Sequence, residues 1–252
     1  MQDFLTRVVV GSAVNLGLLL PLIAVAFLAS GKRGSAVRPV LLFAGLFVLD
    51  EACIWSFKLM QFIPAWGGYN WQGKVLEISW PVLLAIFVPA FSARRIGFTL
   101  PEQRRSWRDL LLVCVLYAVV GVGLILVLLK GTHFGVGKPA TYAYEATMPG
   151  LGEEFVYRGV FLLLLNEAFG RPWKLAGIQF GWGFIIVTAM FGMLHGIDVK
   201  AGATPVIHIY WSAMIFPAII GVLLAWLRER GGSVWPGVLF HNFVNVLNEF
   251  LV

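Results

Sequence analysis

Charged residues are scarce in this sequence: they make up 13% of its 252 residues, whereas hydrophobic residues make up 59%. A typical soluble domain carries about 25% charged residues, so this composition excludes an ordinary soluble globular protein. Apolar runs of about 20 residues are long enough to cross the hydrocarbon core of a bilayer. We therefore predict an all-α, polytopic integral membrane protein with about eight transmembrane helices. The expected spans are Val8–Leu28, Val40–Met60, Val75–Phe91, Leu110–Leu129, Ala146–Phe169, Ile178–His195, Val206–Leu227 and Val234–Val252.

Cysteine is also rare, and Cys53 and Cys114 both fall inside expected spans without a paired spacing. This pattern excludes a disulfide framework and a C-x-x-C metal or redox site. The sequence also lacks low-complexity segments, internal repeats and a loop long enough to form a soluble domain, so we expect a single membrane domain over residues 1–252. Its first apolar run, at about 22 residues, exceeds the 7–15 residues of a signal-peptide core, which indicates a retained helix.

The net charge of +6 comes from basic residues that lie mostly in the loops between spans. If alternate loops face alternate sides, twelve lysines and arginines fall on one side and five on the other. The positive-inside rule then places the first side in the cytoplasm and both termini outside. Because this rule accounts for the positive net charge, we expect no nucleic-acid partner. The first side holds Lys32, Arg33, Arg38, Arg94, Arg95, Arg104, Arg105, Arg108, Arg171, Lys174, Arg228 and Arg230, and the second holds Arg7, Lys74, Lys130, Lys138 and Lys200.

Ionisable residues concentrate in the last five spans, where each costs about 2.5 to 3.5 kcal/mol at membrane depth and is therefore a candidate functional residue. In "EEFVYR", Glu154 and Arg158 are four residues apart with the acid first, which favours a helical ion pair. Glu153 lies about 100° further round the helix and has no such local partner. These positions make Glu153 a candidate general base.

Two further polar motifs occupy separate spans. His195 ends the stretch "FGMLH", near the end of its span, and we expect Phe191 to position it by packing. Successive antiparallel helices would bring His195 to the side of the membrane on which Glu153 lies. In "HNFVNVLN", His241, Asn245 and Asn248 share one helical stripe, from which imidazole and amide groups can donate hydrogen bonds to an oxyanion.

Two uses of this polar set are open. Together the residues could activate a water molecule and stabilise a tetrahedral intermediate, as peptide-bond hydrolysis requires. Alternatively, Glu153, His195 and His241 could bind Zn²⁺ through three ligands, leaving one position for water. The sequence contains neither H-E-x-x-H nor a G-x-S-x-G nucleophile motif.

The three motifs, in this order and in separate hydrophobic segments, resemble the CPBP family: type II CAAX prenyl endopeptidases and their bacterial Abi or bacteriocin-processing relatives. The resemblance covers residues 146–249, while residues 1–108 would form N-terminal helices and a basic linker. It implies that Glu153 and His195 activate a water, that His241 and Asn245 form an oxyanion hole, and that Glu154 and Arg158 support them. The mechanism that the resemblance implies requires no cofactor, although members of the family are described both with and without a divalent metal.

The resemblance implies an intramembrane endopeptidase of a bacterial or archaeal plasma membrane, with a membrane-associated or lipidated protein as substrate. Removal of a C-terminal membrane anchor is a narrower variant. The charge pattern places the start of the fifth span and the end of the sixth outside, whereas eukaryotic prenyl proteases cut cytosolic tails. The alternative from a different class is a non-catalytic immunity protein or transporter that uses the same polar cluster for binding.

Other polar residues have simpler interpretations. The spacing of Glu51 and Lys58 in the second span predicts a buried pair on one face, beside Asp50, with a transport pathway as the alternative. The remaining histidines and polar residues of the last span are interpreted as structural, interfacial or supporting residues. They are His133, His208, Asn242, Asn248 and Glu249.

Overall fold

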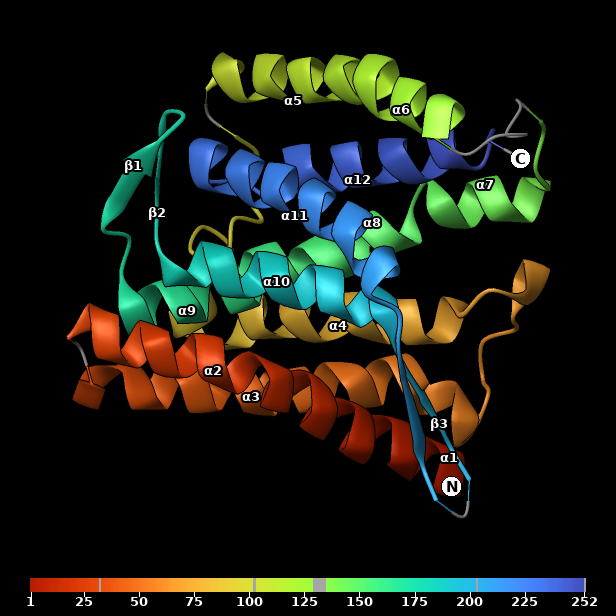
Figure 1. Cartoon of the computed structure of the whole chain (residues 1–252), viewed down its shortest axis with the longest axis horizontal. Coiled ribbons are helices and arrows are strands. Elements are labelled where there is room, and N and C mark those ends of the chain that lie inside the picture. The colour runs from red at the N-terminus through yellow and green to blue at the C-terminus, as the bar shows by residue number, and fades with distance from the viewer. Residues whose placement is uncertain (32, 102, 129–134, 203, 252) are drawn as a thin grey trace.

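The computed structural model describes residues 1–31, 33–101, 103–128, 135–202 and 204–251. Within these ranges the chain runs back and forth along one axis in eight long helical segments, and both termini lie at the same end (Figure 1). The segments are α1–η1–α2 (Gln2–Leu5, Thr6–Val10, Gly11–Ser30), α3 (Arg33–Trp55), α4 (Trp71–Phe87), α5–η5–α6 (Arg104–Leu116, Tyr117–Gly121, Val122–Leu128), α8–η6–α9 (Met148–Glu153, Glu154–Phe161, Leu162–Phe169), α10 (Trp182–Gly196), α11 (Trp211–Gly231) and α12 (Trp235–Asn248). Short helices η2 (Ser56–Lys58), η3 (Trp66–Gly68), η4 (Pro89–Phe91) and α7 (Pro139–Glu145) lie between them.

Four of the described segments are long and apolar enough to cross a membrane: Gln2–Ser30, Gly34–Lys58, Arg104–Leu128 and Trp211–Gly231. The shorter α10 is also apolar. Large apolar side chains such as Leu41 and Leu111 are about two-thirds exposed, at 66% and 64%, which suits contact with lipid. The predicted all-α multi-pass membrane protein is therefore confirmed.

Two expected spans begin later than the hydrophobic pattern indicates, because their first residues form strands. β1 (Trp173–Leu175) pairs with β2 (Ile178–Phe180), and β3 (Ile197–Lys200) pairs with β4 (Val206–Ile209), both antiparallel. The first hairpin turns through Ala176 and Gly177, which both have positive φ, as a tight two-residue hairpin requires. In β4, β-branched residues favour the strand, so hydrophobicity alone misplaced the start of the helix.

An asparagine fixes where α4 begins. The Asn70 side chain accepts a hydrogen bond from the Gly73 amide at 2.9 Å, which caps the first turn. Its amide group also donates to the Ile54 carbonyl at 2.7 Å, and this bond ties the start of α4 to the end of α3. The cap therefore holds the first turns of α4, including Lys74, at a set position beside the rest of the bundle.

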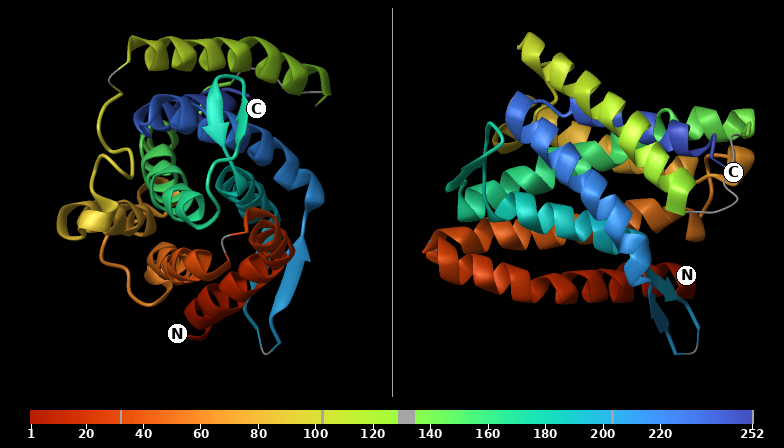
Figure 2. Two further views of the ribbon diagram at one scale, coloured as in Figure 1. Left: turned by 90° about the vertical axis from the view of Figure 1, so that its left-hand side faces the viewer. Right: turned by 45° about the horizontal axis from the view of Figure 1, so that its top comes forward.

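The centre of the bundle is the π-helical segment η6, whose eight residues are all buried. Phe161 of this segment meets Phe43 of α3 edge to face, with ring centroids 5.1 Å apart. Views along and across the bundle show η6 and α10 surrounded by the other helices, with α5 and α6 on one outer face and α2 and α3 on the opposite one (Figure 2). π-helical turns often occur at functional sites, and this one begins at Glu154.

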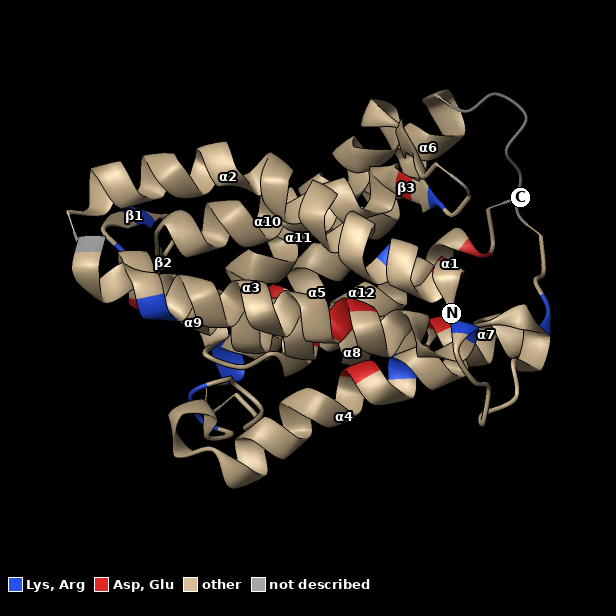
Figure 3. Cartoon of the chain, turned by 90° about the horizontal axis from the view of Figure 1, so that it is seen from below, with Lys and Arg blue, Asp and Glu red and all other residues tan. Residues whose placement is uncertain are grey.

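The helices α2 and α10 contain no Lys, Arg, Asp or Glu. Charged residues do occur near α8 and on α4, and on α4 an acidic and a basic residue lie close together (Figure 3). Loops that the sequence assigned to the basic side do meet at one end of the bundle. There Arg171 lies 2.9 Å from Glu229, and Arg230 lies 2.6 Å from Asp109. Which end faces the cytoplasm stays a prediction.

Candidate active site

The buried pair Glu154–Arg158 is the centre of the site. Glu154 Oε1 lies 2.9 Å from Arg158 Nη1, and both side chains are fully buried, as the spacing predicted for an ion pair. The Arg158 guanidinium also lies over the Phe191 ring at 4.1 Å and donates to the Gly221 carbonyl at 3.4 Å. An arginine with these contacts is fixed in one orientation, so the carboxylate that it binds is fixed too.

Glu154 also orients His241 of α12. His241 Nδ1 lies 3.0 Å from the same oxygen, Glu154 Oε1. Because a carboxylate can only accept, Nδ1 carries the hydrogen in this bond. The other ring nitrogen, Nε2, then faces Glu153, whose Oε2 lies 3.8 Å away. One imidazole therefore lies between the two adjacent glutamates, with Glu154 hydrogen-bonded to it and Glu153 facing its other nitrogen.

His195 is oriented through Phe191 of its own helix. His195 Nδ1 lies 2.7 Å from the Phe191 carbonyl oxygen, so Nδ1 is the donor and Nε2 is left for another partner. The two rings pack with centroids 4.8 Å apart, and the Phe191 ring also meets His241 edge to face at 5.7 Å. The contacts agree with the interpretation of Phe191 as the residue that positions His195.

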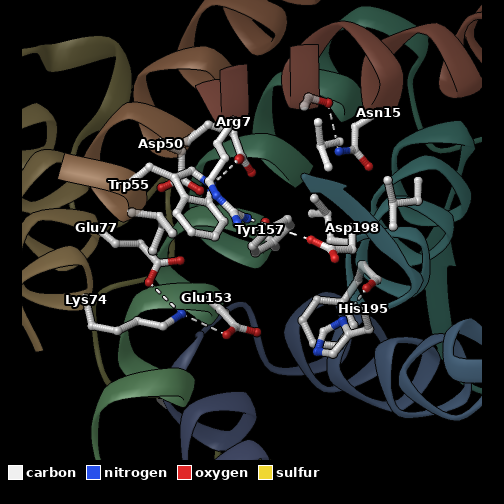
Figure 4. Close-up of a pocket in the computed structure, with 17 residues that line it drawn as sticks. Arg7, Asn15, Asp50, Trp55, Lys74, Glu77, Glu153, Tyr157, His195 and Asp198 are labelled. Carbon is white, nitrogen blue, oxygen red and sulfur yellow. Dashed lines mark hydrogen bonds and ion pairs between the residues drawn. The ribbon is translucent and has the colours of Figure 1, made fainter. Parts of the chain in front are cut away.

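Glu153 and His195 line one cavity of about 270 Å³ and lie on opposite sides of it in Figure 4. The cavity is not built from the last five spans alone, because α2, α3 and α4 supply part of its wall. Its described lining residues are Arg7, Gly11, Asn15, Asp50, Glu51, Ile54, Trp55, Lys74, Glu77, Glu153, Tyr157, Phe191, Leu194, His195, Ile197, Asp198 and Val199.

Asn245 lies apart from this group. It is one turn beyond His241 on α12, and its side-chain amide donates to Glu145 Oε2 at 2.9 Å. It is not among the cavity-lining residues, so its role at an oxyanion stays a prediction. The neighbouring Asn242 has a structural role, since its side-chain oxygen accepts a hydrogen bond from the Gly150 amide at 2.8 Å. Asn248 accepts a hydrogen bond from the Tyr117 hydroxyl.

Sequence reasoning missed the partner of Glu153. Glu153 has none on its own helix, as expected, but Lys74 Nζ of α4 lies 2.8 Å from Glu153 Oε1. The same ammonium lies 2.8 Å from Glu77 Oε2, one turn further along α4. The charge pattern predicts Lys74 in a loop, whereas the structure places it in the first turns of α4. The available signal was a lysine and a glutamate three residues apart at the start of an apolar run.

The pair predicted between Glu51 and Lys58 is wrong. Lys58 Nζ lies 3.1 Å from Asp3 Oδ2, because η2 turns Lys58 toward the first helix. Glu51 instead accepts a hydrogen bond from the Trp55 indole at 3.1 Å, and Asp50 accepts one from the Trp80 indole at 3.0 Å. His208 stacks on Tyr210 in the β4 region, and His133 lies outside the described residues.

The residues do not fit the alternative three-ligand zinc site. Among the described residues, no group of three or more His, Cys, Asp or Glu side chains is arranged to hold a metal ion. Moreover, one oxygen of Glu153 is already bound by the Lys74 ammonium, and a positive charge at that position opposes binding of a dication.

Comparison with known proteins finds a match in the C-terminal part of the chain. Residues 135–247 match the family model described as type II CAAX prenyl endopeptidase Rce1-like. The match is confined to this part of the chain, which we call the Rce1-like segment. The Rce1-like segment contains all six residues predicted for the site and excludes Lys74 and Glu77. No curated protein and no solved structure matches the chain.

Proposed function

We propose that this multi-pass membrane protein is an endopeptidase that cleaves a membrane-associated or lipidated protein within the bilayer, by direct attack of water. The observation that carries the proposal is the shared cavity of Glu153 and His195, with His241 placed between the two glutamates. The match of residues 135–247 to the Rce1-like family model supports CAAX-type proteolysis as the class of reaction. Removal of a C-terminal anchor is a second form of the same chemistry.

In the proposed mechanism, a water molecule lies between Glu153 and His195 Nε2. Glu153 takes a proton as the water oxygen attacks the scissile carbonyl carbon, forming a tetrahedral intermediate. The same proton then passes to the amide nitrogen, the C–N bond breaks, and a carboxylic acid and an amine leave. Water supplies both the oxygen of the new acid and the hydrogens needed by the products, so no other reactant is required.

The oxyanion would be stabilised by His241, with Asn245 as the second donor. Because His241 Nδ1 donates to Glu154, Nε2 can donate to an oxyanion only when the ring carries both hydrogens. Asn245 would have to release Glu145 and turn toward the substrate. Removing one oxyanion donor typically lowers the rate by about 10²- to 10³-fold.

The test compares new protein C-termini in cells that produce the native protein, Glu153→Gln or the matched control Glu167→Gln. Glu167 pairs with Arg95 outside the cavity, so its amide variant changes charge by the same amount without touching the site. We expect cleavage products with the native protein and the control and none with Glu153→Gln. If Glu153→Gln gives the same products, Glu153 is not the general base and the proposed mechanism is wrong. If Glu153→Gln preserves the cellular effect without any product, the polar cluster serves binding or transport instead.

A further inference from the structure

The Rce1-like segment carries the predicted motifs, but its Glu153 carboxylate is bound from outside that segment. Lys74 and Glu77 lie on α4, which precedes residues 135–247. Lys74 Nζ lies 2.8 Å from Glu153 Oε1 and 2.8 Å from Glu77 Oε2. The lysine is 9% exposed and Glu77 1% exposed, so water does little to screen this arrangement.

The contact uses one oxygen of Glu153 and leaves the other available. Oε1 is bound by Lys74, while Oε2 faces His241 Nε2 at 3.8 Å. A carboxylate held by one oxygen cannot rotate freely about its terminal bond, so the second oxygen has a defined direction. Figure 4 shows the Lys74 ammonium between Glu77 and Glu153, with the far side of Glu153 directed toward the cavity.

The backbone of α8 is shaped to permit this contact. A Cβ atom on Gly152 would lie 2.1 Å from Glu77 Oε2, which is far inside van der Waals contact. Only a glycine before Glu153 therefore lets the Glu77 carboxylate approach α8. On the opposite side, the Asn70 cap anchors the first turn of α4 to α3. Both ends of the Lys74 contact are thus fixed by independent features.

From these contacts we propose that Lys74, supported by Glu77, is a positioning residue for Glu153 in the hydrolytic reaction. This inference rests on the proposed function. Lys74 holds Glu153 Oε1 and compensates its charge, so that Oε2 is directed at the water. The N-terminal helices therefore complete the active site, and the family segment alone lacks the group that orients its own general base.

The kinetic test uses Lys74→Met, Lys74→Arg and Lys58→Met in the full-length protein, with the substrate found by the C-terminal comparison. Lys58 is a matched control because it is an ion-paired lysine that does not line the cavity. Since misplacing a catalytic group by about 1 Å can cost about 100-fold, we expect Lys74→Met to lower kcat by about 100-fold with little change in KM. Lys74→Arg should recover part of this loss, and Lys58→Met should match the native rate.

A second measurement needs no substrate. The unfolding temperature in detergent is compared for the native protein, Lys74→Met, Glu153→Gln and the double variant. If Lys74 binds Glu153, Lys74→Met should lower the unfolding temperature less in the Glu153→Gln background than in the native one, because fewer buried carboxylates lose a counter-ion. Additive shifts would show that the two residues do not interact and would overturn the inference.

The outcomes separate the two proposals. If Glu153→Gln is inactive but Lys74→Met cleaves at the native rate, the inference is wrong and the proposed function stands. If Glu153→Gln still cleaves, the proposed mechanism is wrong, and the thermal comparison alone decides whether Lys74 holds Glu153. A Lys74→Met variant that raises KM and leaves kcat unchanged would instead make Lys74 a substrate-binding residue, which also overturns the inference.

Discussion

The two parts of the chain contribute buried charges to the same site in different ways. In the Rce1-like segment, the charged residues are neighbours in sequence, and Glu154 pairs with Arg158 on the same helix. In the N-terminal part, Asp50, Lys74 and Glu77 are just as buried but come from two helices and form no recognisable motif. The difference shows that a linear motif identifies the chemistry of a site, while the groups that orient it can come from elsewhere in the chain.

The two parts also differ in how their helices pack. All residues of η6 are buried, and glycines of α8 and α12 bring backbones close to polar side chains. The helices α3 and α5 carry many exposed apolar residues and form outer walls of the bundle. The same substitution should therefore have a large effect in the centre and a small effect in the walls, and matched pairs of variants can measure the contrast.

The largest contrast is expected for single charges removed from ion pairs. Arg158→Met leaves the fully buried Glu154 without its counter-ion, which should lower the free energy of unfolding by about 3 to 5 kcal/mol. Lys58→Met breaks a pair whose two side chains are 33% and 37% exposed, and pairs of that kind contribute about 0 to 1 kcal/mol. Thermal unfolding in detergent measures both effects.

A double variant separates the loss of the ion pair from the loss of the arginine side chain's packing. In Glu154→Gln/Arg158→Met the Glu154 carboxylate is removed together with its counter-ion, so the double variant should be more stable than Arg158→Met alone. Equal stability of Arg158→Met and Lys58→Met would contradict the picture of a tightly fixed centre with a permissive wall.

Glycine positions give the next largest contrast. A Cβ on Gly150 of α8 would lie 2.3 Å from Asn242 Oδ1 and 2.7 Å from the Val238 carbonyl, so Gly150→Ala should cost about 1 to 3 kcal/mol. Gly45 of α3 has no atom within 4 Å of its added Cβ, and alanine there should stabilise the helix by about 0.5 to 1 kcal/mol. We expect Gly150→Ala to lower the unfolding temperature and Gly45→Ala to raise it. A decrease of similar size at both positions would refute the contrast.

The sequence was sufficient to predict the all-α multi-pass fold and the pairing of Glu154 with Arg158. In a bilayer, a helix satisfies the backbone N–H and C=O groups of a long apolar run within the run itself, and helical spacing placed Glu154 beside Arg158. Because successive helices run antiparallel, the start of one and the end of the next lie on the same side. This prediction placed Glu153 near His195, and both residues line one cavity. These inferences depend on local periodicity and on chain direction, which a sequence contains.

Contacts between distant helices could not be predicted in the same way. Lys74 and Glu153 are 79 residues apart, and their contact depends on how α4 is rotated and on the missing side chain of Gly152. The pairing of Lys58 with Asp3 rather than Glu51 likewise depends on where α3 ends. Hairpins at the starts of two hydrophobic runs were missed because burial in a membrane and strand pairing both favour apolar residues.

A smaller effect is expected where one side chain replaces a missing helical hydrogen bond. The Gly150 amide lies in the first turn of α8, where it has no partner within the helix, and Asn242 of α12 accepts its hydrogen bond. Asn242→Ala should therefore cost about 0.5 to 2 kcal/mol, as loss of a capping residue does. Asn245→Ala removes only a part-buried contact with Glu145, so it should change stability less while lowering the cleavage rate. If Asn245→Ala cleaves at the native rate, its proposed role at the oxyanion is wrong.

The smallest effect is expected for the cysteines, and it bears on the chemistry of cleavage. An acyl-enzyme route of the serine or cysteine protease type needs the hydroxyl of Ser or Thr, or the thiol of Cys, within reach of the substrate. None of the described cavity-lining residues is Ser, Thr or Cys, and the free, partly buried Cys53 and Cys114 do not line the cavity. The double variant Cys53→Ala/Cys114→Ala should therefore cleave within about 2-fold of the native rate, since substitutions away from such features have small effects. A thiol-alkylating reagent should inhibit neither the native protein nor this variant. If this variant loses cleavage while its unfolding temperature is unchanged, the nucleophile is a cysteine thiolate and not an activated water. The Lys74–Glu153 contact would then have no catalytic role.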